Sequence, residues 1–124
     1  MVKAQAESIR VLVVEDHPVA RSALCRILRR HVIVDEANGL REGAALLAAN
    51  TYDVLIVDEV LGDGSGRRLL EQVDIASTSP RPRRVLMSGF HEPDGDVRPY
   101  DHFVQKPDDL LWLVRCIREI AGSR

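Results

Sequence analysis

The sequence predicts an α/β domain with a doubly wound, five-stranded parallel sheet. Two observations carry this prediction. Short apolar runs such as Val11–Val14 and Val54–Val57 show no polar alternation, which is typical of strands buried on both faces. Segments with the apolar period of helices lie between such runs, so strand and helix patterns alternate along the chain. Right-handed crossovers then place helices on both faces of the sheet.

In the first half of the chain, the alternation predicts two strands and two helices before the central strand. They are a strand at about Ile9–Val14, a helix near Pro18–Arg30, a strand at Val32–Val34 and a helix carrying Leu40 to Ala48. Pro18 suits the first turn of its helix, and the arginines of that helix are expected to face mostly outward. Asn38 is expected to cap the second helix, which Asn50 closes.

The second half continues the same alternation. It predicts a strand from Val54 that ends at Asp58, a loop at 62–66, a helix carrying Leu69, Leu70 and Val73, strands at Val85–Met87 and His102–Gln105, and a final helix. Ser65 is expected to cap the helix that follows the loop. Asp108 is expected to open the last helix, and Gly122 stands where a helix stop belongs.

Length and composition indicate one domain, residues 1–124, with its core at about 8–122. A chain of 124 residues with 45% hydrophobic and 29% charged residues can bury a sizeable core and is ordinary for a globular protein. Its net charge of −2 gives no global attraction to nucleic acid or to an anionic membrane. No apolar run approaches the ~20 residues of a membrane span.

Cysteine usage and the first residues of the chain predict a cytoplasmic location. Cys25 and Cys116 fall inside predicted helices and lack the spacing of a metal site, which is typical of reduced thiols in a core. The first eight residues lack the apolar centre of a secretory signal. The final helix ends almost at Arg124, so no DNA-binding output domain is expected within this chain.

Polar residues stand at the ends of four predicted strands. Glu15 and Asp16 follow the first strand, Asp58 ends the third, and Ser88 and Lys106 follow the fourth and fifth. Ligand sites of parallel sheets lie outside the carboxyl ends of the strands, so three acids, a hydroxyl and an ammonium should converge there. Repulsion among the carboxylates favours a bound cation, and a hard divalent ion suits oxygen ligands. Each residue alone could be a cap, a turn former or a solvated side chain, but their joint placement favours a site.

Four motifs together resemble the receiver domains of bacterial two-component signalling proteins. They are the acidic pair Glu15-Asp16, the run Val-Leu-Ile-Val-Asp58 with Gly66 closing the next loop, Val-Leu-Met-Ser88-Gly89, and Phe-Val-Gln-Lys106-Pro107. The resemblance covers nearly the whole chain and implies a flavodoxin-like fold with strand order 2-1-3-4-5. The residues of the last two motifs are most similar to those of receivers attached to hybrid histidine kinases.

The resemblance implies that Asp58 is the phosphoacceptor, which takes a phosphoryl group from a histidine kinase or a histidine phosphotransfer protein. Mg²⁺ would be bound directly by Asp16, by Asp58 and by the backbone carbonyl of Val60, and through water by Glu15. The domain would assist its own phosphorylation and dephosphorylation as a signalling module rather than act as an enzyme. These roles agree with the chemistry, because phosphoryl transfer depends on alignment and charge neutralisation.

The resemblance also assigns residues that would contact the phosphoryl group and respond to it. Lys106 would meet its oxygens as a point charge, and Ser88 would form a hydrogen bond to them. The backbone amides of three residues are expected to complete the set of groups that contact the phosphoryl oxygens: Glu59, Val60 and Gly89. In the family an aromatic residue at the position of Phe103 turns inward with the serine, although Phe103 could equally be plain core.

Two features depart from the usual receiver pattern. Gly62 stands where many receivers carry proline, which leaves the charged residues of the site intact. The connection at 91–101 is shorter than usual and contains two prolines, a glycine and a single aliphatic residue, Val97. Proline lacks the donor that a helix interior needs, so an irregular or mobile segment is expected in place of a regular fourth helix. Phosphorylation could then act by ordering this segment.

Two other classes of function remain open. A phosphatase of the haloacid dehalogenase type also uses an aspartate nucleophile after a parallel strand, but it carries a second acid two residues later, where this chain has Val60. A pseudo-receiver would keep the fold as an interaction module without being phosphorylated.

Trp112 lies off the apolar face of the last helix and should point outward. It would then contact a partner or a second copy in a homodimer, or lie flat over a neighbouring loop.

Overall fold

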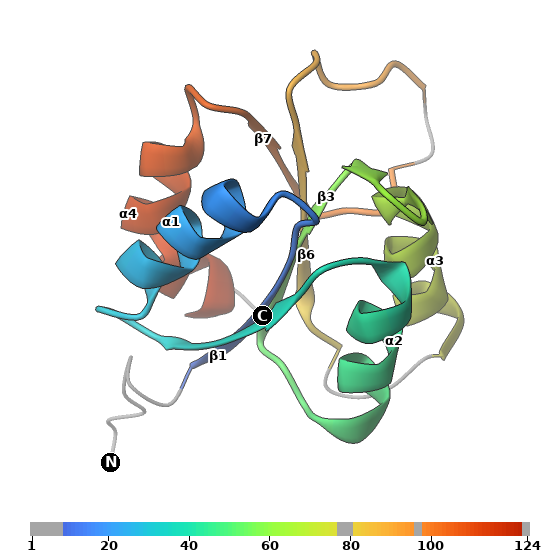
Figure 1. Cartoon of the computed structure of the whole chain (residues 1–124), viewed down its shortest axis with the longest axis horizontal. Helices are drawn as coiled ribbons and strands as arrows, with labels where there is room; N and C mark the ends of the chain where they lie inside the picture. The colour runs from blue at the N-terminus through green and yellow to red at the C-terminus, as the bar shows by residue number, and fades with distance from the viewer. Residues whose placement is uncertain (1–8, 77–80, 96–97, 123–124) are drawn as a thin grey trace.

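A computed structural model describes residues 9–76, 81–95 and 98–122 and contains a five-stranded parallel sheet between two layers of helices (Figure 1). The elements in chain order are β1 Arg10–Val14, α1 Pro18–Leu28, β2 Ile33–Ala37, α2 Leu40–Ala49, β3 Val54–Asp58, β4 Val60–Leu61, β5 Gly64–Ser65, α3 Gly66–Ala76, β6 Arg83–Ser88, β7 His102–Gln105 and α4 Leu110–Gly122. The short strands β4 and β5 form a separate antiparallel hairpin, which the sequence pattern did not predict.

The strand order of the main sheet is β2-β1-β3-β6-β7, which confirms the predicted order 2-1-3-4-5 of a flavodoxin-like fold. All four neighbouring pairs run parallel. Strand β1 lies inside the sheet, where Val14 pairs with Ala37 of β2 and with Val57 of β3. The carboxyl ends of β1 and β3 therefore meet at the same edge of the sheet.

The core consists of two layers, one on each face of the sheet. Val11 and Val13 belong to the cluster that includes side chains of α1 and α4, whereas Leu12 and Val14 belong to the cluster that includes side chains of α3. Figure 1 shows α1 and α4 together on one side of the sheet, with α2 and α3 on the other. Residues 11–14 of β1 alternate between the two layers and are all buried, which explains why this run contains no polar residue.

Strand β2 is present as predicted, but it runs over Ile33–Ala37, so its predicted bounds, Val32–Val34, were wrong. The predicted bounds left out Asp35 and Glu36, which lie inside the strand. At the edge of a sheet, polar side chains can reach partners and solvent beside the strand. The ion-pair and hydrogen-bond partners are Arg10 and Tyr52 for Asp35, and Arg21 and Arg29 for Glu36.

The start of α2 also differs from the prediction, because Asn38 does not cap the helix. Gly39 occupies the N-cap position and forms no side-chain cap. Instead, the carboxylate of Asp63 accepts hydrogen bonds from the backbone amides of Leu40, at 2.9 Å, and Arg41, at 3.2 Å. These two bonds hold the pKa of Asp63 below its usual value. The cap comes from the β4–β5 hairpin, so a local sequence pattern cannot reveal it.

The starts of α3 and α4 were also predicted, the first correctly. The Ser65 hydroxyl accepts the backbone amide of Arg67 at 3.2 Å, which confirms that Ser65 caps α3. Helix α4 begins at Leu110 rather than at Asp108, because residues 106–109 form a turn. Asp109 then accepts the backbone amide of Gln105 at 3.1 Å, so this turn ties the end of β7 to the start of the helix.

The connection between β6 and β7 contains no helix among its described residues, as the sequence predicted. Tyr100 covers part of the sheet face instead, because it is buried in the cluster around α3 and its ring centroid lies 6.1 Å from that of Phe103. The Tyr100 hydroxyl donates to Glu92 at 2.8 Å, and Arg98 pairs with the same carboxylate at 3.3 Å. Val97 lies outside the described residues.

Candidate functional site

The three predicted acids meet at the carboxyl edge of the sheet. Glu15 and Asp16 directly follow β1, and Asp58 is the last residue of β3, the neighbouring strand. One carboxylate oxygen from each residue lies within 4.8 Å of the other two, so this cluster could hold a metal ion. Glu15 and Asp58 are only 2% and 7% exposed, whereas Asp16 faces solvent. The site therefore has two buried acids and one open side.

Lys106 supplies the positive charge for the two buried acids. It follows β7, and its ammonium lies 2.8 Å from Glu15 Oε1 and 3.0 Å from Asp58 Oδ2. Burial alone would lower the pKa of Lys106, but the hydrogen bonds to both carboxylates outweigh it and raise that pKa above its usual value. The structure thus brings Lys106 to the position predicted from its strand end.

The second oxygen of Glu15 also has a partner in the chain. Glu15 Oε2 accepts the backbone amide of His17 at 3.2 Å, while Nδ1 of His17 accepts the amide of Ala20 and caps α1. Both oxygens of Glu15 are therefore engaged within the protein. Asp16, which the sequence had suggested as an alternative helix cap, does not take the capping position.

Ser88 ends β6 next to the central acid. It is almost fully buried, its hydroxyl accepts the amide of Phe90 at 3.0 Å, and its carbonyl accepts the amide of Lys106 at 2.7 Å. Met87 is the residue of β6 that pairs with Asp58, so Ser88 lies one residue beyond the pair at the same edge. The hydroxyl of Ser88 therefore belongs to the group of side chains that the strand ends bring together.

One backbone donor expected at the site is already engaged. The amide of Glu59 donates to the carbonyl of Met87 at 2.7 Å, so it is not free to face a ligand in this structure. The reason is that this bond belongs to the last pair of the ladder between β3 and β6, in which Asp58 lies opposite Met87. The carbonyl of Glu59 in turn accepts the amide of Gly66 at 2.9 Å, which fixes the backbone after Asp58 on both sides.

Two glycines allow the close approach of loops around the acids. A Cβ atom at Gly66 would lie 2.0 Å from the carbonyl oxygen of Asp58, so only glycine fits where α3 starts against the end of β3. At Gly62 a Cβ atom would lie 3.3 Å from Asp16 Oδ2, which places the loop after Asp58 beside the exposed acid. The departure at Gly62 therefore lies in direct contact range of the site.

Neither Phe103 nor Trp112 belongs to the acidic cluster. Phe103 is half-buried and packs against the cluster around α3. Trp112 is 45% exposed, which confirms that it points outward, and its ring centroid lies 6.4 Å from that of His102 on β7. The indole thus covers part of a strand as well as facing solvent.

None of the helices among the described residues combines the length and apolar character needed to cross a bilayer.

Comparisons with known proteins agree with this architecture. A family model described as the response regulator receiver domain matches residues 11–110. The chain is 30% identical over 87 residues to the sensory transduction protein LytR of Staphylococcus epidermidis, which covers 68% of this chain and 33% of the relative. LytR of Staphylococcus haemolyticus is 24% identical over 119 residues, which covers 90% and 45%. The chain thus spans between a third and a half of the length of these relatives.

A solved structure shows the same fold. The response regulator protein TrrA of Thermotoga maritima, crystallised in complex with Mg²⁺-BeF, superposes with a TM-score of 0.80 at 21% identity. The match covers 90% of this chain and 98% of that one. At this level of identity the superposition establishes the fold, while the chemistry of the site rests on the side chains described above.

Proposed function

Because this chain belongs to the response regulator receiver domain family, we propose that it accepts a phosphoryl group on Asp58 from a histidine kinase or a histidine phosphotransfer protein. One observation carries the proposal. The Asp58 carboxylate stands at a strand end between the acidic pair and the ammonium of Lys106, which lies 3.0 Å from it. Phosphoryl transfer demands such alignment and charge neutralisation more than covalent assistance from the protein.

The site supports a Mg²⁺-dependent reaction, with the ion held by Asp16, Asp58 and the carbonyl of Val60. Three carboxylates within 4.8 Å offer only hard oxygen ligands, which match the preference of Mg²⁺. When bound, this ion would neutralise negative charge on the acids and on the incoming phosphoryl oxygens. Both oxygens of Glu15 already accept hydrogen bonds within the chain, which supports an indirect role for it through water.

Lys106 and Ser88 would serve the phosphoryl group after transfer. Lys106 would exchange part of its contact with Asp58 for the new oxygens, which carry about −1.5 to −2 charge. The Ser88 hydroxyl would leave the amide of Phe90 and donate to a phosphoryl oxygen. That exchange would alter the 91–101 segment, and Phe103 packs beside the Tyr100 that anchors it. The signal would then be relayed through this segment as a conformational switch.

The proposed activity is that of a cytoplasmic signalling domain rather than an enzyme. At Val60, two residues after Asp58, the aliphatic side chain cannot act as the general acid that an aspartate-based phosphatase needs. No role in binding nucleic acid is proposed for this chain.

A homodimer through the exposed face of Trp112 is a separate part of the proposal. Sedimentation velocity of Trp112→Ala and of the parent chain tests it.

The decisive experiment is labelling by acetyl phosphate, followed by intact-mass measurement. The parent chain should gain one phosphoryl group only when Mg²⁺ is present, and Asp58→Asn should gain none. Asp108→Asn, which removes an exposed carboxylate outside the site, serves as the matched control and should be labelled like the parent. Labelling of Asp58→Asn at the parent level would overturn the assignment, and a parent chain that is never labelled would identify a pseudo-receiver.

Hydrogen exchange of the same samples tests the relay. The amides of 91–95 and 98–101 should change their protection when Asp58 is phosphorylated, because the contact between Ser88 and Phe90 opens at the start of this segment. Identical exchange in both states would remove the switching role while leaving phosphorylation intact.

A further inference from the structure

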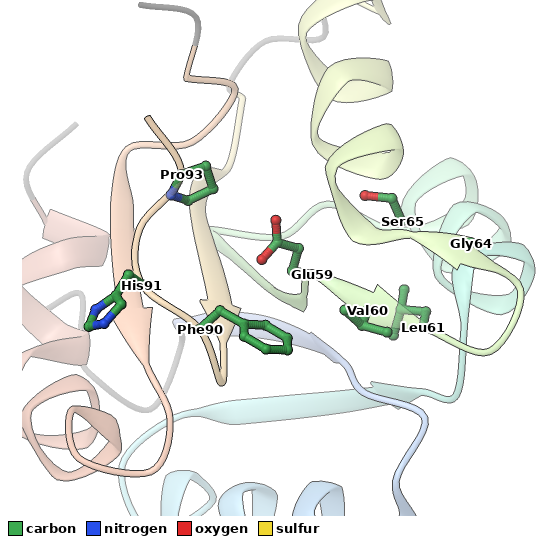
Figure 2. Close-up of a pocket in the computed structure, with 8 residues that line it drawn as sticks. All are labelled: Glu59, Val60, Leu61, Gly64, Ser65, Phe90, His91 and Pro93. Atoms are coloured by element: carbon green, nitrogen blue, oxygen red, sulfur yellow. The ribbon is translucent and has the colours of Figure 1, made fainter. Parts of the chain in front are cut away.

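A pocket of about 560 Å³ lies beside the acidic site, between the β4–β5 hairpin and the start of the connection from β6 (Figure 2). Val60, Leu61 and Ser65 form its wall on the hairpin side, and Phe90 and Pro93 form the other. A volume of this size falls within the range of ordinary ligand sites. The pocket is lined by none of the three acids that could hold a metal ion, and it borders the acidic site through Val60, whose backbone carbonyl is a proposed Mg²⁺ ligand.

The carboxylate of Glu59 enters this pocket. Figure 2 shows it projecting between Pro93 and Ser65, while the imidazole of His91 points away from it. Among the residues that the structure describes, none forms an ion pair or hydrogen bond with the Glu59 carboxylate. Its position is nevertheless well defined, because the amide of Glu59 is bonded to Met87 and its carbonyl to Gly66. The Glu59 carboxylate is therefore held in the pocket, and it has no partner among the described residues.

The side chains next to this charge are apolar and unusually exposed. Phe90 is 70% exposed and Val60 is 61% exposed, although both belong to residue types that normally avoid water. Figure 2 shows the Phe90 ring directed toward Val60, below the Glu59 carboxylate. An aromatic face, an aliphatic side chain and a carboxylate thus border the same space.

We propose that this pocket binds an arginine side chain of a partner protein. A guanidinium group can pair with the Glu59 carboxylate through two parallel hydrogen bonds, and its planar, weakly hydrated cation can stack on the ring of Phe90. The methylene stem of the arginine would cover Val60 in the same pose. This ligand satisfies the unpaired charge and the exposed apolar surface together, which neither a neutral apolar group nor an anion would do.

The proposal does not depend on phosphorylation of Asp58, and its test uses the unphosphorylated chain. The probe is the peptide acetyl-leucyl-arginyl-leucinamide. It is added to the protein in saturating MgCl₂, so that the arginine of the peptide does not bind to the exposed carboxylate of Asp16. Binding is followed by backbone amide shifts in two-dimensional NMR spectra. The largest shifts are expected at Glu59, Val60 and Phe90. The citrulline analogue, which has the same shape without the charge, should bind at least fivefold more weakly.

Two variants locate the site. Glu59→Gln and Phe90→Ala should each lower the affinity for the arginine peptide at least fivefold, whereas Glu119→Gln, the matched loss of an exposed carboxylate on α4, should not change it. Equal binding of the two peptides, unchanged affinity in Glu59→Gln, shifts confined to other surfaces, or no binding of the arginine peptide would each overturn the proposal. The comparison of the two peptides on the parent chain decides the matter even if a variant fails to fold.

Discussion

Lys106 Nζ lies 2.8 Å from Glu15 Oε1, although 91 residues separate the two in the sequence. Strands β1 and β7, which they follow, are separated in the sheet by β3 and β6, so the lysine side chain reaches past Asp58 to the second buried acid. Its single positive charge therefore serves two carboxylates that would otherwise repel each other in a poorly solvated place. This arrangement couples the stability of the fold to the charge balance of the site.

Replacement of Lys106 by methionine should destabilise the protein, because it leaves the carboxylates of Glu15 and Asp58 buried without their common cation. A loss of about 1–3 kcal/mol in the free energy of unfolding is expected in the absence of metal. Urea denaturation measures it, with Arg118→Met on the exposed face of α4 as the control. Added MgCl₂ should stabilise the variant more than the parent. A variant as stable as the parent without metal would contradict the role of this pair.

Asp16→Asn should weaken Mg²⁺ binding more than Glu15→Gln. Asp16 is exposed and free to contact an ion, whereas hydrogen bonds from Lys106 and His17 already occupy the two oxygens of Glu15. Isothermal titration with MgCl₂ gives the two dissociation constants. The reverse order would reject the assignment of direct and indirect ligands.

Gly66→Ala should destabilise the chain by about 1–3 kcal/mol or more, because its Cβ atom would lie 2.0 Å from the carbonyl oxygen of Asp58 and 2.8 Å from Val57 Cγ2. Both neighbours belong to the central strand, so moving either of them would disturb the pairing of the sheet. Gly89→Ala is the matched control, since nothing lies within 4 Å of a Cβ atom there. Thermal denaturation of the two variants compares them directly. Equal stabilities would show that α3 shifts freely against β3.

Asp101→Asn should destabilise the protein at neutral pH and have little effect in acid. Burial alone would raise the pKa of Asp101, but hydrogen bonds from the backbone and guanidinium of Arg84, together with the charge of Arg83, hold that pKa below its usual value. A lowered pKa means that the stabilisation is present above the pKa of the unfolded chain and is lost as pH falls through the folded value.

The expected difference between parent and Asp101→Asn is therefore roughly 1–2 kcal/mol near pH 7, and it should shrink from about pH 4 downward. Urea denaturation at several pH values from 7 down to about 2 measures it. Asp108→Asn removes an exposed carboxylate and is the control. A difference between Asp101→Asn and the parent that stays constant across this range would show that the ionised carboxylate of Asp101 contributes nothing.

Much of this architecture was predictable from single segments of the chain. The uninterrupted apolar runs of β1 and β3 can be satisfied only by burial on both faces, and such burial requires a parallel sheet covered by helices. Once the strands are parallel, their carboxyl ends share an edge, so residues that follow them, from Glu15 to Lys106, had to gather there. The prolines at 91–101 likewise excluded a regular helix by a local property of the backbone.

The tertiary structure alone decided which distant groups became partners. Asp63 caps α2 from a hairpin more than twenty residues away, and Tyr100 fills part of the face that a helix would otherwise cover. The pocket around Glu59 likewise exists only because Phe90 and Pro93 come to lie opposite the β4–β5 hairpin. The physical reason is the same in each case: a sequence period reports which face of an element is apolar, whereas a hydrogen bond or a cavity depends on the spatial approach of segments that share no local pattern.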